Sequence, residues 1–239
     1  LRLSAASAGN DHRLGANEAP PAVISIFLGD ELTAVLDALE SGTPLKSGAH
    51  DKEFVIGVDA LPNFPKDATD RNRTSPFAFT GNKFEFRMLG SSDSISCTNT
   101  IMNTIVAEIL DGFATELEKA DDFEKALKEL LIKTYKEHKR VIFNGNGYSD
   151  DWVKEATEVR GLPNYVSTVD CMPHYTDEKN VKMFEKFKVY TSTELASRTE
   201  ILLENYSKVI NIEALTMIDM TRKQILPAVM KYTKDICDV

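Results

Sequence analysis

The stretch N-R-T-S-P-F-A-F-T-G-N-K-F-E-F-R, residues 72–87, decides how the first part of this chain folds. Residues typical of β-strands flank Thr80-Gly81-Asn82, which predicts a hairpin turn. Because successive side chains of a strand point to opposite faces, Lys83, Glu85 and Arg87 share one face of the second arm. Such a polar face suits the floor of an active-site cleft, and it equally suits a half-exposed strand with a salt-bridged surface.

A second polar stretch, S-A-G-N-D-H-R-L-G-A-N-E-A-P-P, covers residues 7–21. Its small and polar residues, followed by two prolines, predict a loop. Arg13 suits recognition of a carboxylate, since a guanidinium presents a planar fork of donors, but it could instead staple the loop or form a surface ion pair. Glu18 sits where a mobile flap could carry it over a reaction, and the other interpretation is an exposed loop glutamate.

Together the two stretches contribute three arginines, Arg13, Arg73 and Arg87, and two glutamates, Glu18 and Glu85. Arginine stabilises the charge on a transferring phosphoryl group, and glutamate can hold a hard metal ion or move a proton. The mixture indicates an anionic, phosphorylated substrate. No phosphate-binding loop or dinucleotide motif occurs. A metal held by Glu85 would need further carboxylates, which its own strand does not offer.

The rest of the chain has helical periodicity. Apolar spacing predicts helices over residues 22–39, from 98 through 117, and after a cap at Asp121 or Asp122. Further helix starts are predicted at Ser149, at residues 176–178 and at the capping box Thr191-x-x-Glu194, with an interruption of the last helix near Asn211 or Pro227. We therefore expect an α+β fold, mostly helical, with a small antiparallel sheet from residues 54–58 and 77–88. The chain divides into a polar-site part, residues 1–98, and a helical region, residues 99–239.

Composition narrows the class of protein. The 239 residues carry a net charge of -9 and no basic run, which argues against a nucleic-acid or membrane-surface partner. Three widely spaced cysteines predict reduced thiols and a cytoplasmic protein. The longest apolar run, residues 22–28, is too short to span a bilayer. Because a dense motif begins within ten residues of Leu1, we expect a piece of a longer polypeptide.

The quoted stretches resemble glutamine synthetases, and specifically the long type III bacterial form. The resemblance rests on A-G-N-D-H-R-L-G-A-N-E-A-P-P-A-V-I-S-I-F-L-G (residues 8–29) and D-R-N-R-T-S-P-F-A-F-T-G-N-K-F-E-F-R (residues 70–87). It is close over about the first 110 residues, and the helical remainder is consistent with the C-terminal region of that form. One departure is Ala78, where many members of the family carry a second arginine.

This resemblance implies ATP-dependent ligation of ammonia to glutamate through γ-glutamyl phosphate, with Mg²⁺ or Mn²⁺. Arg13 and Arg87 would then bind the glutamate substrate, and Arg87 could contact phosphate. Glu18 would be the catalytic flap residue, and Arg73 would stabilise the transferring phosphoryl group. Arg73 and Lys83 would contact the nucleotide, and Glu85 would ligate the metal ion.

In that family the other metal ligands precede the segment seen here, and a small N-terminal domain completes the site of a neighbouring subunit in a ring. The partners would thus be glutamate, ammonium, ATP, the N-terminal part of the same polypeptide and neighbouring subunits. We therefore predict that this chain alone is inactive. Two alternatives remain, a γ-glutamyl-amine ligase of the same family and a helical assembly module without catalysis.

Overall fold

The computed structural model describes residues 9–16, 19, 23, 25–44, 53–54, 64–65, 74–90 and 93–238. Its helices and strands, in chain order, are α2 (Asn10–Arg13), β1 (Ile26–Phe27), α3 (Gly29–Ser41), β2 (Glu53–Phe54), β3 (Phe64–Pro65), β4 (Phe77–Phe79), β5 (Phe84–Phe86), α4 (Ile95–Leu117), α5 (Phe123–His138), α6 (Asp150–Lys154), α7 (Thr168–Cys171), α8 (Glu178–Lys186), α9 (Ser192–Met220) and α10 (Leu226–Cys237). Helix predominates, which confirms the predicted α+β, mostly helical class.

The central sheet has the strand order β1-β4-β5. β4 and β5 form the predicted antiparallel hairpin, in which Phe77 pairs with Phe86 and Ala78 with Glu85. β1 lies parallel to β4, so the sheet is mixed and not purely antiparallel. The prediction that residues 54–58 join it was wrong at Phe54, because β2 pairs with β3 in a separate two-stranded ribbon. Residues 55–58 lie outside the described residues.

The first long helix starts later than its apolar spacing predicts. α3 begins at Gly29 and not near residue 22, because Ile26 and Phe27 are drawn into the sheet as β1. Gly29 itself has φ of 80°, a left-handed conformation that glycine adopts without steric cost and that breaks the chain from strand into helix.

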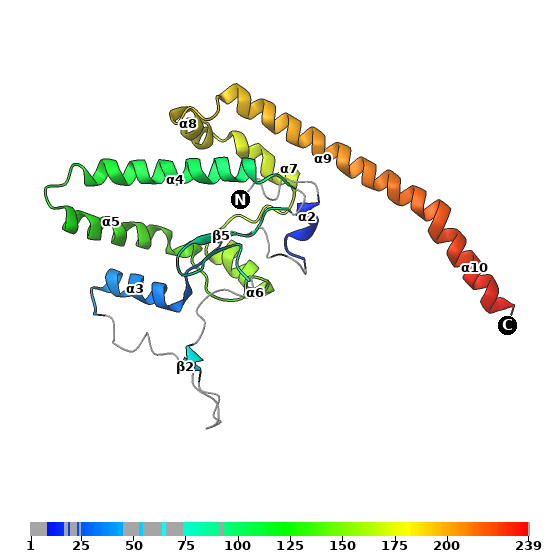
Figure 1. Ribbon diagram of the computed structural model, residues 1–239, viewed down its shortest axis with the longest axis horizontal. Coiled ribbons are helices and arrows are strands. Elements are labelled where there is room, and N and C mark those ends of the chain that lie inside the picture. The colour runs from blue at the N-terminus through cyan, green and yellow to red at the C-terminus, as the bar shows by residue number, and fades with distance from the viewer. Residues whose placement is uncertain are drawn as a thin grey trace.

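Helices α4 and α5 form an antiparallel pair, and α3 lies on the other side of α5 (Figure 1). Ser94 caps α4 by accepting from Ser96 N, and Asp122 caps α5 by accepting from Lys125 N. The Tyr135 hydroxyl of α5 donates to Asp37 of α3 at 2.7 Å, and Lys139 Nζ, just after α5, donates to Glu40 of α3 at 2.9 Å.

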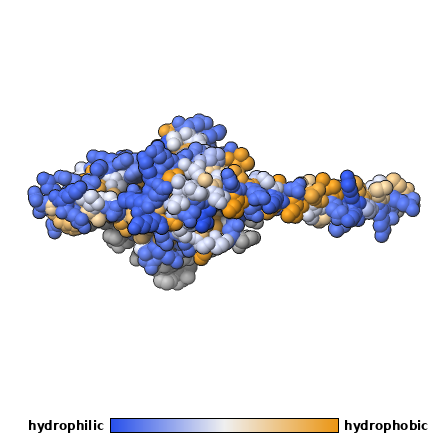
Figure 2. All heavy atoms as spheres, turned by 90° about the horizontal axis from the view of Figure 1, so that it is seen from above, coloured by the Kyte–Doolittle hydropathy of each residue, from blue (hydrophilic) through white to orange (hydrophobic). Residues whose placement is uncertain are grey.

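The C-terminal helices form one long rod that projects from the body of the molecule (Figure 1). Thr191 and Glu194 make the predicted capping box at its start. α9 continues through Asn211, so the interruption comes at the other predicted place, where a π-helical turn, Thr221–Ile225, precedes Pro227. Every residue from 211 to 238 except Thr221 is exposed. In Figure 2, apolar residues cover much of the visible surface of this rod.

Two groups of buried apolar side chains hold the body together. The larger contains, with exposures of 8% or less, Leu14, Ala19, Met88, Ile101, Cys171, Met172, Tyr175, Phe184 and Leu195. The smaller contains Val23, Trp152, Ala156 and Leu162. The larger group joins the polar-site segment to the helical region, because residues of both contribute to it. All three cysteines are free thiols. Within the described ranges, no helix has the length and apolar character needed to cross a membrane.

Candidate functional site

The loop that carries Arg13 is fastened to the end of the hairpin. Arg13 Nη1 donates to Asn10 Oδ1 at 2.6 Å and to the Met88 carbonyl at 3.4 Å, and Nη2 donates to the Arg87 carbonyl at 3.4 Å. Asn10 Nδ2 also donates to the Met88 carbonyl, at 2.8 Å. These contacts make Arg13 a staple between α2 and the residues that follow β5. Three of the five N–H donors of its guanidinium serve that purpose.

The second strand of the hairpin presents the predicted polar face. Arg87 Nη2 lies 3.1 Å from Glu85 Oε2, and Lys83 Nζ lies 3.4 Å from Glu85 Oε1. The side chain of Arg87 is 14% exposed, that of Glu85 39% and that of Lys83 66%. The hydrogen bond from Arg87, and then that from Lys83, lowers the pKa of Glu85 because both cations favour the carboxylate form. Glu85 is therefore an anion held between two cations.

The opposite face of the hairpin is aromatic. Phe77 stacks on Phe84 with 5.3 Å between ring centroids and meets Phe86 edge-on at 6.2 Å. Phe79 lies 5.3 Å from Phe84. Contacts of this kind contribute about 0.5–1.5 kcal/mol each beyond burial, and here they set the register that keeps Lys83, Glu85 and Arg87 together.

The structure thus brings four of the predicted residues, Arg13, Lys83, Glu85 and Arg87, to one hairpin and the loop beside it. Glu18 and Arg73 lie outside the described residues. Leu14 and Ala19 are 7% and 1% exposed, and Gly15 N donates to the Ala19 carbonyl at 3.1 Å.

A metal ion does not fit the described residues alone. Both carboxylate oxygens of Glu85 already face cations. In the described part of the chain, no three His, Cys, Asp or Glu side chains lie close enough together to hold a metal. Hard divalent cations take several oxygen ligands, so Glu85 could be at most one member of a larger set.

Ala78 occupies a buried position in the hairpin. Its side chain is fully buried, and it pairs in register with Glu85 on the neighbouring strand. A long charged side chain there would have to displace the atoms that bury Ala78.

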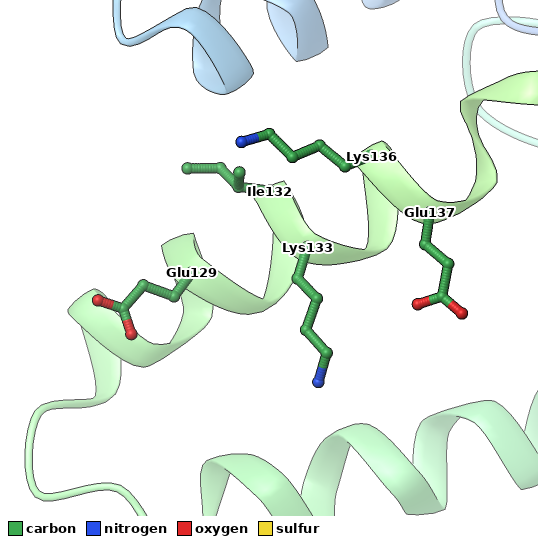
Figure 3. Close-up of a pocket in the computed structure, with 5 residues that line it drawn as sticks. All are labelled: Glu129, Ile132, Lys133, Lys136 and Glu137. Carbon is green, nitrogen blue, oxygen red and sulfur yellow. The ribbon is translucent and has the colours of Figure 1, made fainter.

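A surface hollow lies away from these residues, on the helices. An open hollow of about 580 Å³ lies along α5 and is lined by Glu129, Ile132, Lys133, Lys136 and Glu137. In Figure 3, Ile132 and Lys136 point toward α3, whereas Lys133 and Glu137 point toward α4. Because these side chains diverge, they do not form a convergent binding site.

Two asparagines were missed by reasoning from the sequence. Asn10 is 3% exposed and holds Arg13, as described above. Asn144 Oδ1 accepts from the backbone N–H groups of Leu28 and Gly29, both at 3.1 Å, at the start of α3. The position of Asn10, three residues before Arg13 inside the quoted motif, was the available signal. Asn144 has no local partner in sequence, so nothing in its neighbourhood pointed to it.

Comparison with known proteins identifies the family. Residues 126–239 match the family model described as the glutamine synthetase C-terminal domain. The chain is 48% identical over 241 aligned positions to a glutamine synthetase of Butyrivibrio fibrisolvens, covering 99% of this chain and 33% of that protein. It is 46% identical to the type-3 glutamine synthetase of Dictyostelium discoideum, covering 100% of this chain and 32% of that protein.

A glutamine synthetase of Bacteroides fragilis is 39% identical, covering 97% of this chain and 32% of that protein. The chain therefore spans about a third of the length of the curated relatives that it matches. Similarity at this level over nearly every residue agrees with the motifs of the hairpin and of the α2 loop. The chain belongs to the glutamine synthetase family.

Proposed function

We propose that the full-length protein carrying this chain ligates ammonia to glutamate at the expense of ATP. In the first step an oxygen of the glutamate γ-carboxylate attacks the γ-phosphorus of ATP, and ADP leaves. In the second step the nitrogen of ammonia attacks the γ-carbonyl carbon, phosphate leaves with the bond electrons, and the nitrogen gives one proton to that phosphate to leave the neutral amide. The observation that carries the proposal is that the Arg13 guanidinium lies against the backbone of Arg87 at the end of β5, where the Arg87 guanidinium faces Glu85.

Each predicted residue has a role in this proposal. Arg13 binds a carboxylate of glutamate, and Arg87 binds glutamate or phosphate through its planar fork. Glu18 takes the proton of ammonium, and Arg73 stabilises the transferring phosphoryl group. Lys83 joins Arg73 at the nucleotide phosphates, since its largely exposed ammonium can reach a ligand above the strand. Glu85 is proposed as one ligand of Mg²⁺ or Mn²⁺, with the other ligands coming from outside the described residues.

Substitution of the two arginines in the full-length enzyme tests this function. Arg13→Ala should raise the glutamate KM by about 30-fold or more, because truncating one partner of a buried charge pair costs about 2–5 kcal/mol. Arg13→Lys should recover only part of that loss, since an ammonium cannot reproduce the fork. Arg198→Lys is the matched control, because Arg198 lies over the ring of Tyr190 in the helical region, with 4.3 Å to the ring centroid. Unchanged glutamate KM in Arg13→Ala and Arg87→Ala would refute the proposal.

We also propose that the isolated chain has no synthetase activity, because its described residues supply a single carboxylate on the polar face. Phosphate release from ATP in the presence of glutamate and ammonium measures this directly. Turnover by the purified chain above a no-protein blank would overturn it. Competition between ammonium and primary amines in the full-length enzyme separates a glutamine synthetase from a γ-glutamyl-amine ligase.

A second role, in assembly, is favoured by the projecting helices. On α9, the π-helical turn and α10, the exposed large apolar side chains, with exposures of 43–71%, include Ile212, Leu215, Met217, Ile218, Met220, Ile225, Leu226, Val229, Met230, Tyr232 and Ile236. Apolar surface on this scale marks a contact with other protein. We propose that these helices pack against another part of the full-length polypeptide or a neighbouring subunit.

Light scattering of the full-length protein tests the assembly role. Val229→Asp should lower the molar mass or the melting temperature of the assembly, whereas Arg13→Ala should raise the glutamate KM and leave the assembly intact. A Val229→Asp protein with unchanged mass and melting temperature would rule this role out. The division at residues 98 and 99 and the cytoplasmic location stay predictions.

A further inference from the structure

We propose that Asn10 is a positioning residue that holds the Arg13 guanidinium in place for the glutamate substrate. This inference rests on the proposed role of Arg13. Asn10 is 3% exposed, and its side-chain amide lies between Arg13 and the end of β5. It donates to the Met88 carbonyl at 2.8 Å and accepts from Arg13 Nη1 at 2.6 Å.

The orientation of the amide follows from its partners. A backbone carbonyl can only accept a hydrogen bond and a guanidinium can only donate one. Nδ2 must therefore face Met88, and Oδ1 must face Arg13. Rotating the amide by a half turn about the Cβ–Cγ bond would exchange Nδ2 and Oδ1 and lose both hydrogen bonds. Asn10 therefore has one orientation that makes both bonds.

Asn10 also makes the shortest contact of the Arg13 guanidinium with the described residues. The two bonds to the carbonyls of Arg87 and Met88 are both 3.4 Å long, against 2.6 Å for the bond to Asn10. Hydrogen bonds weaken toward 3.5 Å, so the Asn10 amide dominates the inward side of the guanidinium. Without it, only two long bonds would set the direction of Arg13.

The backbone around Asn10 places its side chain beside Arg13. Gly9 has φ of 88° and turns the chain into α2 at Asn10, and Leu14 N closes the single turn on the Asn10 carbonyl at 2.9 Å. A spacing of three residues places Asn10 and Arg13 on the same side of that turn.

Outer partners of this kind act on a site by limiting the orientations of the residue that touches the substrate. Loss of the Asn10 amide should therefore weaken glutamate binding more than ATP binding. The chemistry itself should suffer less, since Asn10 contacts neither substrate in this proposal. The expected signature is a selective rise of one KM.

The test uses full-length enzyme with Asn10→Leu, which keeps the approximate volume and removes both hydrogen bonds. We expect the glutamate KM to rise about tenfold, equivalent to about 1.4 kcal/mol, with the ATP KM within about twofold of wild type. In an Arg13→Lys background the same change should raise the glutamate KM less than about threefold, because Asn10 acts through the guanidinium. Asn144→Ala is the control, since it removes another bridging amide that lies at the start of α3.

The outcomes distinguish failure of the proposed function of Arg13 from failure of the positioning role of Asn10. If Arg13→Ala leaves the glutamate KM unchanged, the proposed function of Arg13 fails and this inference falls with it. If Arg13→Ala raises the glutamate KM but Asn10→Leu does not, or if the two effects add, only the positioning role is overturned. Should Asn10→Leu not fold, Asn10→Ser replaces it, because its shorter hydroxyl cannot reach both partners, and the same readings apply.

Discussion

The Asn144 amide joins two segments more than a hundred residues apart, and removing it should measurably destabilise the chain. Asn144 Oδ1 accepts from Leu28 N and Gly29 N, and Nδ2 donates to Thr33 Oγ1 at 2.9 Å. The two backbone groups belong to the N-cap of α3, Leu28, and to its first residue, Gly29, where N–H groups have no partner within the helix. The side chain of Asn144 thus caps α3 from a distant part of the chain.

The stability lost in Asn144→Ala follows from the backbone N–H groups that the substitution leaves unpaired. Loss of a helix cap costs about 0.5–2 kcal/mol, and a buried donor without a partner costs about 1–3 kcal/mol. Gly29 is buried, whereas Leu28 is partly exposed and its N–H can regain a water partner. We therefore expect the free energy of unfolding to fall by about 1–3 kcal/mol. For a chain of this length that corresponds to a melting temperature about 2–12 °C lower.

Urea unfolding of the purified chain, followed by circular dichroism, measures this change. Asn144→Asp is the matched variant, because a carboxylate still accepts both N–H bonds, and the Thr33 hydroxyl can reverse its role and donate. Its unfolding free energy should stay within about 0.5 kcal/mol of wild type. The reasoning is refuted if Asn144→Ala is as stable as wild type, or if the Ala and Asp variants lose the same stability.

Three further outcomes are expected from the same structure. Glu85 has a lowered pKa, so its ion pairs stabilise the fold above its ordinary pKa of 4.5 and stop doing so as the pH falls through the lowered value. In urea titrations, the difference in unfolding free energy between wild type and Glu85→Gln should therefore narrow on acidification. A difference that does not change with pH would contradict this. Burial and the hydrogen bond to Asp37 raise the pKa of Tyr135 to about 12, so its contribution to folding stability persists below about pH 10 and is lost as the pH rises toward 12. Tyr135→Phe should remove a tyrosinate absorbance step that appears only at that high pH. The same substitution should lower the unfolding free energy by about 1 kcal/mol at neutral pH. Limited trypsin digestion should cut first between Arg222 and Lys234, which lie in the exposed part of the rod. Early cleavage at the lysines of α5 or α8 would argue against the described packing.

Local chemistry made the hairpin and its polar face predictable. A Gly-Asn turn between alternating residues specifies both register and side-chain direction, and the observed pairing of Ala78 with Glu85 follows from it. Caps at Asp122 and Thr191 were equally readable, because each depends on side chains within three residues of the backbone groups that they satisfy.

The errors arose where a distant segment competes with local preference. Residues 26 and 27 have helical spacing with their neighbours, but β4 offers them strand partners and Ile142 bridges them on the other side. Phe54 finds its partner in Phe64 and not in the hairpin. Pairing between segments so far apart in sequence depends on where the folded chain brings them together, and the periodicity of the apolar residues does not encode this.

The sequence by itself determined the family, the set of arginines and glutamates, and the face of the strand that carries Lys83, Glu85 and Arg87. These follow from motif order and from the two-residue period of a strand, both of which are local. Only the tertiary structure decided that Arg13 lies against the end of β5, that Asn10 holds it there, and that Glu85 is paired with two cations. A hydrogen bond across seventy-eight residues depends on the folded path of the backbone, and no spacing within either motif encodes that path.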